Sequence, residues 1–482
     1  MEAGAVTHFE DRPRSAPPAV PFSGPSAHRI EVAALTLLSL SEAPAAVAIM
    51  PRVAGTDEPG VPAAERRGWR SHASRLALDI GPLRRYPAFR RLWFSQGISF
   101  IGTEIAEVAL AYQMYQLTGS TLAVGLISLT HLVPLLTLTV IGGAIADAFD
   151  RRRLMLLQQV GMVVGSVGLA ANAAFDHPRV WPLYVFQFVI SASFSIGVGA
   201  QRSMTPQLVD EAHFMSASAL NSVTSQFGAV GGPALAGVLI KFLDLKWLYL
   251  GDSISYIGAI VAVALLPRLV AIEDADRPSW SSIAAGFRYV RRQPVILGFF
   301  LVDTNAMIFG MPSALFPAMA AHRFGDPALV GYLYMAPAAG ALVVSLLSGP
   351  LRHIRRQGLG VAVSAALWGL AIAAFGFAQQ LWIALLLLGL AGFGDQISAI
   401  LRSVMLYRIT PKQMLGRVSG IEFMQVAAAP SVGNLEAGAL ASVTSVRFSI
   451  VTGGVACLVG CLALAFAFPA LLRYDSRADA EP

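Results

Sequence analysis

Charged residues are scarce in this chain. Asp, Glu, Lys and Arg make up only 13% of its 482 residues, whereas hydrophobic residues make up 55%. Soluble globular domains carry about 25% charged residues, so the chain has too few charges to cover a water-facing surface of its size. The mean hydropathy of +0.61 points the same way. The composition therefore argues against a soluble protein and predicts that lipid solvates much of the surface.

Sites for catalysis or metal binding are also missing from the sequence. The two cysteines, Cys457 and Cys461, stand one helical turn apart in an apolar run, too few for a disulfide framework or a metal site. We expect both to pack as small apolar residues. There is no Gly-Lys-Ser/Thr phosphate-binding loop, no cluster of zinc ligands and no Cys/His pair suited to nucleophilic catalysis. We therefore expect no cofactor, no metal and no enzymatic activity.

Apolar runs of about 20 residues follow one another from Leu92 onward, the length that a helix needs to cross a bilayer. They predict an all-α membrane protein with twelve transmembrane helices. The predicted spans are 92–116, 122–146, 154–175, 180–201, 217–240, 246–266, 294–319, 328–350, 359–378, 381–404, 418–443 and 447–471. Trp247, Trp368 and Trp382 stand near span ends and are expected as interfacial anchors.

Basic residues gather in the loops on one side of these spans, as in Arg151–Arg153, rather than in one patch that would suit nucleic acid. The other side holds only Arg179, Lys241, Lys246, Arg323 and Arg447. Because cytoplasmic loops carry an excess of Lys and Arg, both termini are predicted to be cytoplasmic. The even number of spans agrees with that orientation.

The two halves of the chain resemble each other. Residues 119–125 are similar to residues 325–331, and Gly143 and Gly349 share the same separation of 206 positions, each just before an arginine cluster. Further on the separation becomes 200, where Arg202 matches Arg402. Two parallel six-helix halves are typical of a transporter with a central site between them.

These patterns divide the chain into five parts. The termini are a disordered extension, 1–85, and a cytoplasmic tail, 473–482. The six-helix bundles are 86–266 and 294–472, joined by a basic cytoplasmic loop, 267–293. A wrongly assigned start codon is the alternative for the extension, since Met50 could begin a shorter chain.

Glycine, aspartate and arginine recur with a defined spacing between the second and third spans. Gly143 and Asp147 precede Arg151, Arg152 and Arg153. The alternative is an ordinary basic loop. The spacing resembles the signature of the major facilitator superfamily, although Ala148 and Asp150 depart from it. That resemblance implies the superfamily's fold and a gating role for the motif, with Arg202 as a partner for Asp147.

A second motif lies in the predicted fifth span, where Gly228, Gly232, Pro233 and Gly237 occur close together. Proline bends a helix and small residues permit close helix crossing, so generic membrane packing is one interpretation. The motif also resembles the antiporter motif of drug exporters in the same superfamily, which would favour export over uptake.

Three further segments, 86–90, 285–290 and 415–420, narrow the resemblance. In this order and at these separations they are similar to the enterobactin exporter and its relatives in the drug:proton antiporter-3 group, which include macrolide and multidrug efflux proteins. The resemblance covers about 86–475. It implies proton-driven export across the bacterial inner membrane but does not identify the substrate.

Ionisable residues inside predicted spans are costly and functional by default. Glu104 and Glu107 share one face of the first span, and Asp303 and Asp395 lie in the seventh and tenth. These four are the candidates for proton coupling, with a structural hydrogen bond as the alternative role. Further candidates are Glu422, Glu436 and His131, although a histidine there is more often a hydrogen-bonded interior residue.

Together these observations predict a monomeric, multi-pass exporter of the bacterial inner membrane that exchanges protons for a siderophore or a drug-like molecule by alternating access. A broad multidrug or macrolide pump is the first alternative. A non-transporting membrane sensor and a membrane enzyme are more remote ones. The expected partners are the substrate, protons and the lipid bilayer, with no nucleic acid.

Overall fold

The computed structural model describes residues 79–148, 150–266 and 280–475, without the side chains of 139–148, 202, 203, 280–283 and 352. Within these ranges all regular structure is helical. The first bundle, called the N-half here, consists of α4 (Pro87–Thr118), α5 (Thr121–Ala148), α6 (Arg151–Ala174), α7 (Trp181–Leu208), α8 (Glu211–Phe242) and α9 (Leu245–Ala264). The short α3 (Gly81–Arg85) precedes it.

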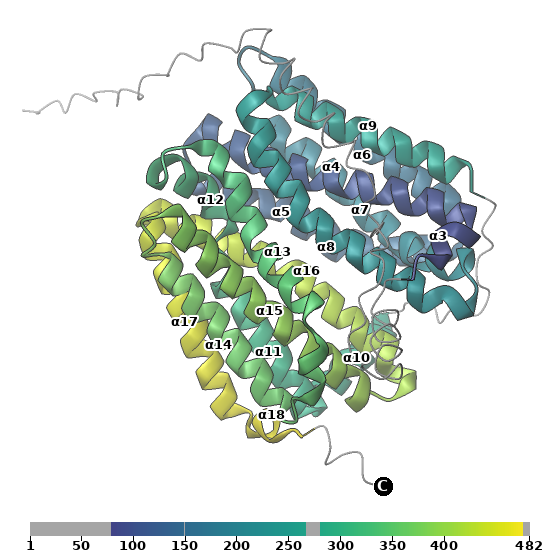
Figure 1. Ribbon diagram of the computed structural model, residues 1–482, viewed down its shortest axis with the longest axis vertical. Helices are drawn as coiled ribbons and strands as arrows, with labels where there is room; N and C mark the ends of the chain where they lie inside the picture. Colours follow the sequence, from purple (N-terminus) through teal and green to yellow (C-terminus); the bar gives the residue numbers. More distant parts are fainter. Residues whose placement is uncertain (1–78, 149, 267–279, 476–482) are drawn as a thin grey trace, which may run out of the picture. The chain divides into compact units, whose positions relative to one another are not determined.

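The second bundle, the C-half, forms a separate group of helices in Figure 1. It consists of α11 (Pro294–Phe309), η1 (Ser313–Leu315), α12 (Phe316–Ala318), η2 (Met319–Arg323), η3 (Pro327–Leu329), α13 (Val330–Leu346), η4 (Gly349–His353), α14 (Gln357–Phe375), α15 (Leu381–Ile409), α16 (Lys412–Val443) and α17 (Val446–Ala467). The helix α10 (Trp280–Arg292) precedes it and α18 (Pro469–Arg473) ends it.

Ten helical segments in the described ranges are long and apolar enough to cross a membrane. The remaining long helices, α4 and α16, have 32 residues each but carry more polar side chains, including two glutamates in each. Large apolar side chains such as Leu346, Val443 and Phe466 are 71%, 80% and 79% exposed, which suits contact with lipid. The predicted twelve-helix membrane fold is confirmed.

The two halves repeat the same helix packing. In the N-half α6 packs against α7 and α9, and α4 packs against α8 and α9. In the C-half α14 packs against α15 and α17, and α11 packs against α16 and α17. Each half therefore has the same internal neighbours, as the sequence repeat predicts.

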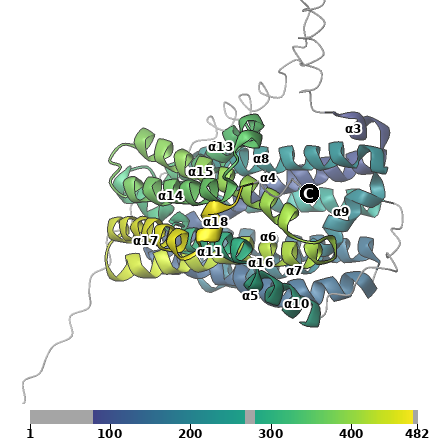
Figure 2. The same ribbon diagram turned by 90° about the horizontal axis from the view of Figure 1, so that it is seen from below.

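The helix bundle has two ends, which differ in their number of arginines. We call one the arginine-poor end, defined by the connections 119–120, 175–180, 243–244, 324–329, 376–380 and 444–445. The opposite, arginine-rich end carries α3, α10, α18 and the connections 209–210, 347–356 and 410–411. Figure 2 shows the bundle turned by 90°.

Contacts between the halves run along two helix pairs, α5 with α16 and α8 with α13. At the arginine-poor end the Thr121 hydroxyl donates to the carbonyl oxygen of Gly438 at 3.0 Å. There Gly125 also lies against the α16 backbone, and a Cβ on it would meet the Asn434 carbonyl oxygen at 2.8 Å. Small residues thus bring the halves into backbone contact at this end.

The seventh span differs from the single helix predicted for 294–319. α11 ends at Phe309, and short 3₁₀, α and π segments continue the span to Arg323. Pro312 has no amide hydrogen to extend the helix, and the Trp368 indole donates to the Gly310 carbonyl oxygen at 2.9 Å. The expectation of Trp368 as an interfacial anchor is therefore wrong, because its side chain is only 5% exposed.

Two ranges predicted to lack helices are partly helical. The extension 1–85 is described only from Asp79 onward, and α3 lies within that part. Asp79 accepts from the Gly81 amide and the Ser216 hydroxyl, and these bonds lower the pKa of its carboxyl. The central connection 267–293 contains α10, which packs against α16.

Candidate functional site

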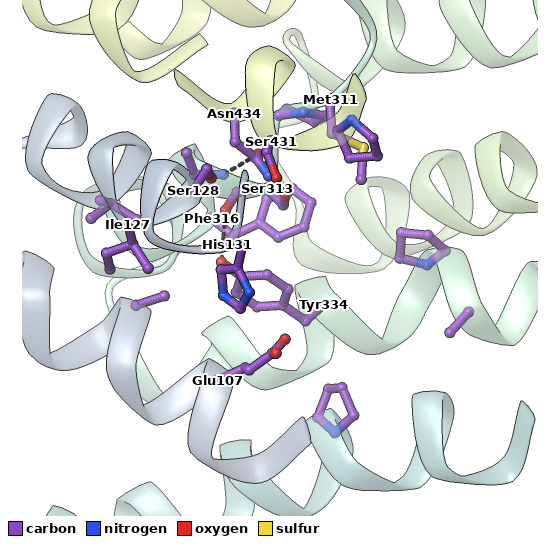
Figure 3. A pocket seen from close by; sticks show the side chains of 18 of the residues that line it. Glu107, Ile127, Ser128, His131, Met311, Ser313, Phe316, Tyr334, Ser431 and Asn434 are labelled. Atoms are coloured by element: carbon purple, nitrogen blue, oxygen red, sulfur yellow. Dashed lines mark hydrogen bonds between the residues drawn. The ribbon is translucent and has the colours of Figure 1, made fainter. Parts of the chain in front are cut away.

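A cavity of about 470 Å³ lies between the two halves (Figure 3). α4, α5 and α8 supply its N-half wall, and η1, α12, α13, α14, α15 and α16 supply its C-half wall. Its polar lining residues are Glu104, Glu107, Ser128, His131, Ser313, Tyr334, Trp368, Ser431 and Asn434. The rest of the lining is apolar, which is usual for a small-molecule site.

Two carboxylates stand on the N-half wall. Glu104 and Glu107 share one face of α4 because they are three residues apart, and both lie near the middle of this helix. Glu107 is exposed to the cavity, whereas Glu104 is half-buried beside Gly232 of α8. Among the described residues no hydrogen bond or ion pair is formed by either carboxylate. Both predicted candidates are therefore available to a proton or a ligand.

The C-half wall carries three aromatic side chains and one amide, those of Phe316, Tyr334, Trp368 and Asn434. Phe316 and Tyr334 meet edge to face at 5.0 Å between ring centroids. The Tyr334 hydroxyl donates to the Ser313 carbonyl oxygen at 2.9 Å, and the Asn434 side-chain oxygen accepts from the Ser313 hydroxyl at 2.6 Å. These bonds fix the wall and leave its aromatic surfaces for contact with a ligand.

Three prolines inside helices line the cavity. Pro233 of α8, Pro337 of α13 and Pro430 of α16 all lie inside helices and all line the cavity. A proline inside a helix cannot donate to the carbonyl four residues earlier. At Pro233 that residue is Ala229, which also lines the cavity. The wall can therefore offer a main-chain acceptor in addition to the carboxylates.

The cavity lining contains two glutamates but neither lysine nor arginine. In a site removed from water, uncompensated charge acts strongly: two unit charges 4 Å apart interact by about 4 kcal/mol at an effective dielectric constant of about 20. The site therefore attracts cations, including protons, and opposes anions.

His131 lies on the same wall but is held by α7. Its two ring nitrogens lie 2.8 Å from the Gln187 side-chain nitrogen and 3.1 Å from the Ser191 hydroxyl. Both nitrogens are thus engaged within the N-half. This is the arrangement of a hydrogen-bonded interior histidine.

The glycines of the motif in α8 all mark close helix crossings. Gly228 lies against Phe100 and Gly232 against Glu104, both on α4. Gly237 lies across the interface, where a Cβ would meet the Ala328 carbonyl oxygen at 2.9 Å and Gly331 Cα at 3.3 Å. The motif therefore packs against α4 through Gly228 and Gly232, lines the cavity through Pro233 and contacts the C-half through Gly237.

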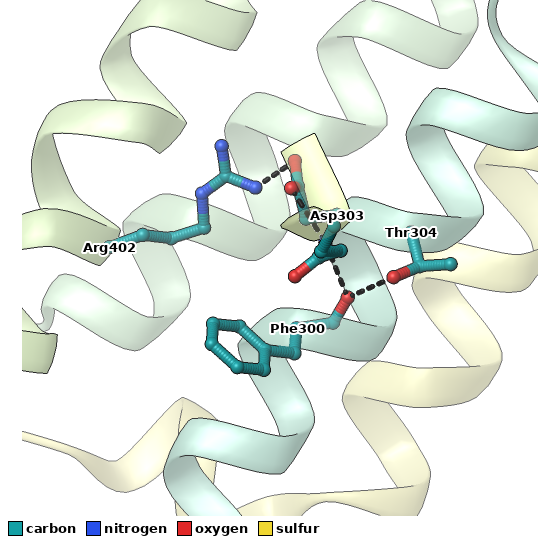
Figure 4. A network of polar contacts seen from close by, with 5 residues as sticks. Phe300, Asp303, Thr304 and Arg402 are labelled. Atoms are coloured by element: carbon teal, nitrogen blue, oxygen red, sulfur yellow. Dashed lines mark hydrogen bonds and ion pairs between the residues drawn. The ribbon is translucent and has the colours of Figure 1, made fainter. Parts of the chain in front are cut away.

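Asp303 lies in a different environment from the two glutamates. It forms an ion pair with Arg402 of α15, and both side chains are buried. The Gln425 amide donates to its second carboxylate oxygen at 2.8 Å and also to the Phe300 carbonyl oxygen at 3.2 Å. Figure 4 shows the ion pair between Asp303 and Arg402. Asp303 does not line the cavity. Its carboxylate is thus neutralised within the C-half.

The other predicted acids are also outside the cavity lining. Asp395 is half-buried in α15, and Glu422 and Glu436 are half-buried in α16. None of the three lines the cavity.

The motif between α5 and α6 is only partly described. The side chains of Asp147 and Arg202 lie outside what the structure describes, as do the surroundings of Gly143, so the predicted contact between Asp147 and Arg202 is not seen. Arg151 is buried in the first turn of α6, and Arg152 donates from its guanidinium to the Ala264 carbonyl oxygen of α9. Arg153 is exposed. Asp150, which departs from the family pattern, caps α6 by accepting from the Arg152 amide at 2.9 Å.

Sequence reasoning missed two buried charged groups. Arg402 was matched to Arg202 in the repeat but not to Asp303. Asp252 of α9 is 2% exposed and accepts from the Ser166 hydroxyl at 2.8 Å. An acid inside the apolar run 246–266 was the available signal for Asp252.

Comparison with known protein families gives one consistent result. The family model described as transmembrane secretion effector matches residues 78–481. The enterobactin exporter EntS of Citrobacter koseri is 31% identical over 390 residues, covering 80% of this chain and 93% of the exporter. The enterobactin exporter EntS of Shigella dysenteriae serotype 1 is 30% identical over 392 residues, with the same coverage.

Solved structures of transporters share the fold. A bacterial homologue of the human lysosomal transporter Spinster, in an inward-facing and unoccupied conformation, superposes with a TM-score of 0.64 at 13% identity, covering 80% of this chain and 97% of that one. The nucleoside transporter NupG gives a TM-score of 0.62 at 13% identity, covering 80% and 99%. At these identities the likeness concerns the fold alone.

Proposed function

This chain belongs to the transmembrane secretion effector family of the major facilitator superfamily, and from that membership we propose that it exports a small organic molecule in exchange for protons. The observation that carries the proposal is the cavity between the halves, whose lining holds two carboxylates but neither lysine nor arginine. The membrane proposed is the bacterial inner membrane, with the arginine-rich end and both termini in the cytoplasm.

The charge of the cavity limits the substrate. A neutral or positively charged molecule can enter beside Glu104 and Glu107, whereas an anion would meet uncompensated negative charge. The aromatic C-half wall favours a substrate with a flat or apolar surface. The cavity volume of about 470 Å³ suits a drug-sized molecule.

Proton exchange follows from the same two groups. A carboxylate that binds a proton loses its attraction for a cation, so protonation and substrate binding compete at Glu107 and Glu104. Alternating exposure of the cavity to the two sides of the membrane then couples substrate release to proton entry. The backbone contacts between the halves at the arginine-poor end support a state closed toward the outside.

The relatives named as enterobactin exporters favour a siderophore as the substrate. The second candidate is broad efflux of drug-like cations, and the two glutamates together with the largely apolar lining favour it. The charge of the transported molecule distinguishes a siderophore from a drug-like cation more sharply than its size does.

The test uses inside-out membrane vesicles that contain the full chain and have an acidic lumen. Uptake is measured for three probes: ethidium as a cation, enterobactin, and carboxyfluorescein as an anion. We expect uptake of ethidium or enterobactin, collapse of that uptake when nigericin abolishes the pH gradient, and no uptake of carboxyfluorescein.

Vesicles without the protein give the background for each probe. Uptake that persists after nigericin would refute proton exchange. A preference for carboxyfluorescein would refute the charge assignment. Uptake of none of the probes above background would count against export of either substrate class.

A further inference from the structure

The helix α10 is fixed to the C-half by one of its faces. Val290 is 2% exposed and belongs to the main apolar cluster of the C-half. The Tyr289 hydroxyl donates to the Ile409 carbonyl oxygen of α15 at 3.1 Å. A Cβ on Gly286 would lie 3.2 Å from Arg417 Cβ of α16. α10 is therefore a packed helix rather than a free connection.

The opposite face of α10 is basic and aromatic. Phe287 is 58% exposed, and Arg288, Arg291 and Arg292 are also exposed. These four residues and Ala284 line a second cavity of about 470 Å³. Among the described residues none of the three arginines forms an ion pair, and α10 itself contains no acidic residue. We call Phe287, Arg288, Arg291 and Arg292 the α10 basic face.

The position of α10 along the membrane normal follows from its neighbour in the chain. Gln293 alone separates the end of α10 from Pro294, where α11 and a membrane span begin. Figure 1 also shows α10 beside the ends of α11 and α16. The C-terminal turn of α10, with Arg291 and Arg292, therefore lies at the depth where the hydrocarbon gives way to headgroups.

From this geometry we propose that the α10 basic face is a binding site for the headgroups of anionic phospholipids. The three arginines supply bidentate donors for phosphate oxygens. Phe287 enters the boundary between headgroups and acyl chains, as aromatic residues of interfacial helices do. A free phosphate would use the arginines but would gain nothing from Phe287, so the exposed aromatic side chain favours a lipid.

Lipid binding here would act on the transporter through packing. α10 contacts α15 through Tyr289 and α16 through Gly286, and both of these helices also line the central cavity. A bound headgroup would hold the arginine-rich ends of α10, α15 and α16 together. The site does not depend on the proposed substrate or on proton exchange.

The experiment measures lipid binding by the purified full chain in detergent micelles. Fluorescent dioleoylphosphatidylglycerol is titrated and compared with the equally labelled phosphatidylcholine. The test variant combines Arg288→Gln, Arg291→Gln and Arg292→Gln. Each arginine near an anionic surface strengthens binding about fivefold, so the affinity for phosphatidylglycerol should fall on the order of a hundredfold. Binding of phosphatidylcholine should not change.

The matched control combines Arg84→Gln, Arg85→Gln and Arg90→Gln, three exposed arginines at the same end whose loss changes the net charge equally. This control should retain most of the affinity. Phe287→Ser should weaken lipid binding without affecting inorganic phosphate. If the triple variant does not fold, Arg291→Gln alone should still lower the affinity about fivefold.

Three outcomes would overturn the proposal. Equal losses in the α10 and control variants would mean that general positive charge attracts the lipid. Displacement of phosphatidylglycerol by inorganic phosphate at equal concentration would identify a phosphate site instead. Equal affinity for the two lipids in the wild-type chain would remove the anionic preference.

Discussion

The N-half and the C-half share their helix packing but differ in the surroundings of the acids in their first long helices, α4 and α11. In the N-half Glu104 and Glu107 face the cavity, and no described residue pairs with them. In the C-half Asp303 is buried with Arg402 and Gln425, away from the cavity lining. The fold repeats, whereas the electrostatics do not.

This difference separates two roles that the sequence had assigned to one group of acids. A carboxylate paired with a buried arginine is held in its charged form, and changing that state would leave the arginine uncompensated. A carboxylate in an open cavity can gain and lose a proton at a lower cost. We therefore propose that proton exchange belongs to the N-half, and that the C-half supplies a wall of aromatic and apolar side chains without an acid.

The largest expected effect comes from removing the charge of the N-half wall. Glu104→Gln and Glu107→Gln keep the side-chain volume but cannot exchange a proton, so uptake driven by a pH gradient should be abolished in the double variant. Each single variant should lose most of its uptake. The measurement is probe uptake into vesicles with an acidic lumen, at equal protein levels.

Glu436→Gln is the matched control, because Glu436 is a half-buried acid of α16 that does not line the cavity. It should leave uptake nearly unchanged. Full uptake by the Glu104 and Glu107 double variant would refute the assignment of proton exchange to the N-half.

The second prediction concerns the ion pair of the C-half. Arg402→Met leaves Asp303 buried and unpaired, which should lower the free energy of unfolding by about 3–5 kcal/mol. Combining it with Asp303→Leu removes both charges and should restore most of the stability, since replacing a complete buried pair by apolar residues is often neutral. Thermal unfolding of the purified variants measures both effects.

The double variant also tests the comparison of the halves. If the pair only stabilises the C-half, the double variant folds and still couples uptake to the pH gradient. A folded double variant whose uptake no longer depends on the pH gradient would mean that Asp303 takes part in proton exchange, which is the role that the sequence suggests for it.

The third prediction concerns the crossing of the two halves at the arginine-poor end. A side chain on Gly331 of α13 would collide with backbone atoms of Pro233 and Gly237 in α8. Overpacking of this kind costs about 1–3 kcal/mol, so Gly331→Val should raise the population open at this end by about tenfold.

Accessibility of an introduced cysteine reports that population. Ser313→Cys in the cavity should react faster with a membrane-impermeant thiol reagent added on the arginine-poor side. The two native cysteines are 0% and 1% exposed, which keeps the background low. Gly420→Val is the control, because a Cβ there meets no atom within 4 Å. Equal reactivity in both variants would contradict a state closed at this end.

The fold was largely predictable because each membrane span must be long and apolar, and this requirement is local in the sequence. Glu104 and Glu107 were recognisable for the same reason, since an acid in an apolar run is costly and therefore conspicuous. The repeat gave the division into halves. All of these signals can be read within one span, or by comparing one span with another.

The contacts between distant spans were not predictable in this way. The pair of Asp303 and Arg402 joins residues 99 positions apart, and only the folded bundle shows that they meet. The position of Trp368 in the sequence suggested an interfacial anchor. Its partner, the carbonyl oxygen of Gly310, becomes apparent only in the structure, where α11 ends at Phe309. The packed face of α10 depends on Val290 joining the apolar cluster of the C-half and on Tyr289 reaching the end of α15. The charge pattern of the connection did not indicate either contact.

The smallest expected effect concerns a polar link between the halves at the same end as the glycine crossing. The side-chain nitrogen of Lys241, at the end of α8, lies 3.6 Å from a carboxylate oxygen of Asp326. Asp326 precedes η3 and caps it by accepting from the Ala328 amide. Both side chains are largely exposed, at 60% and 42%, so water and salt screen the pair. Exposed ion pairs contribute about 0–1 kcal/mol. Lys241→Gln should therefore change the reactivity of Ser313→Cys by less than about fivefold, and the change should disappear at 1 M salt. A larger effect that persists at high salt would mean that this ion pair, rather than the packing of Gly237 on Gly331, closes the arginine-poor end.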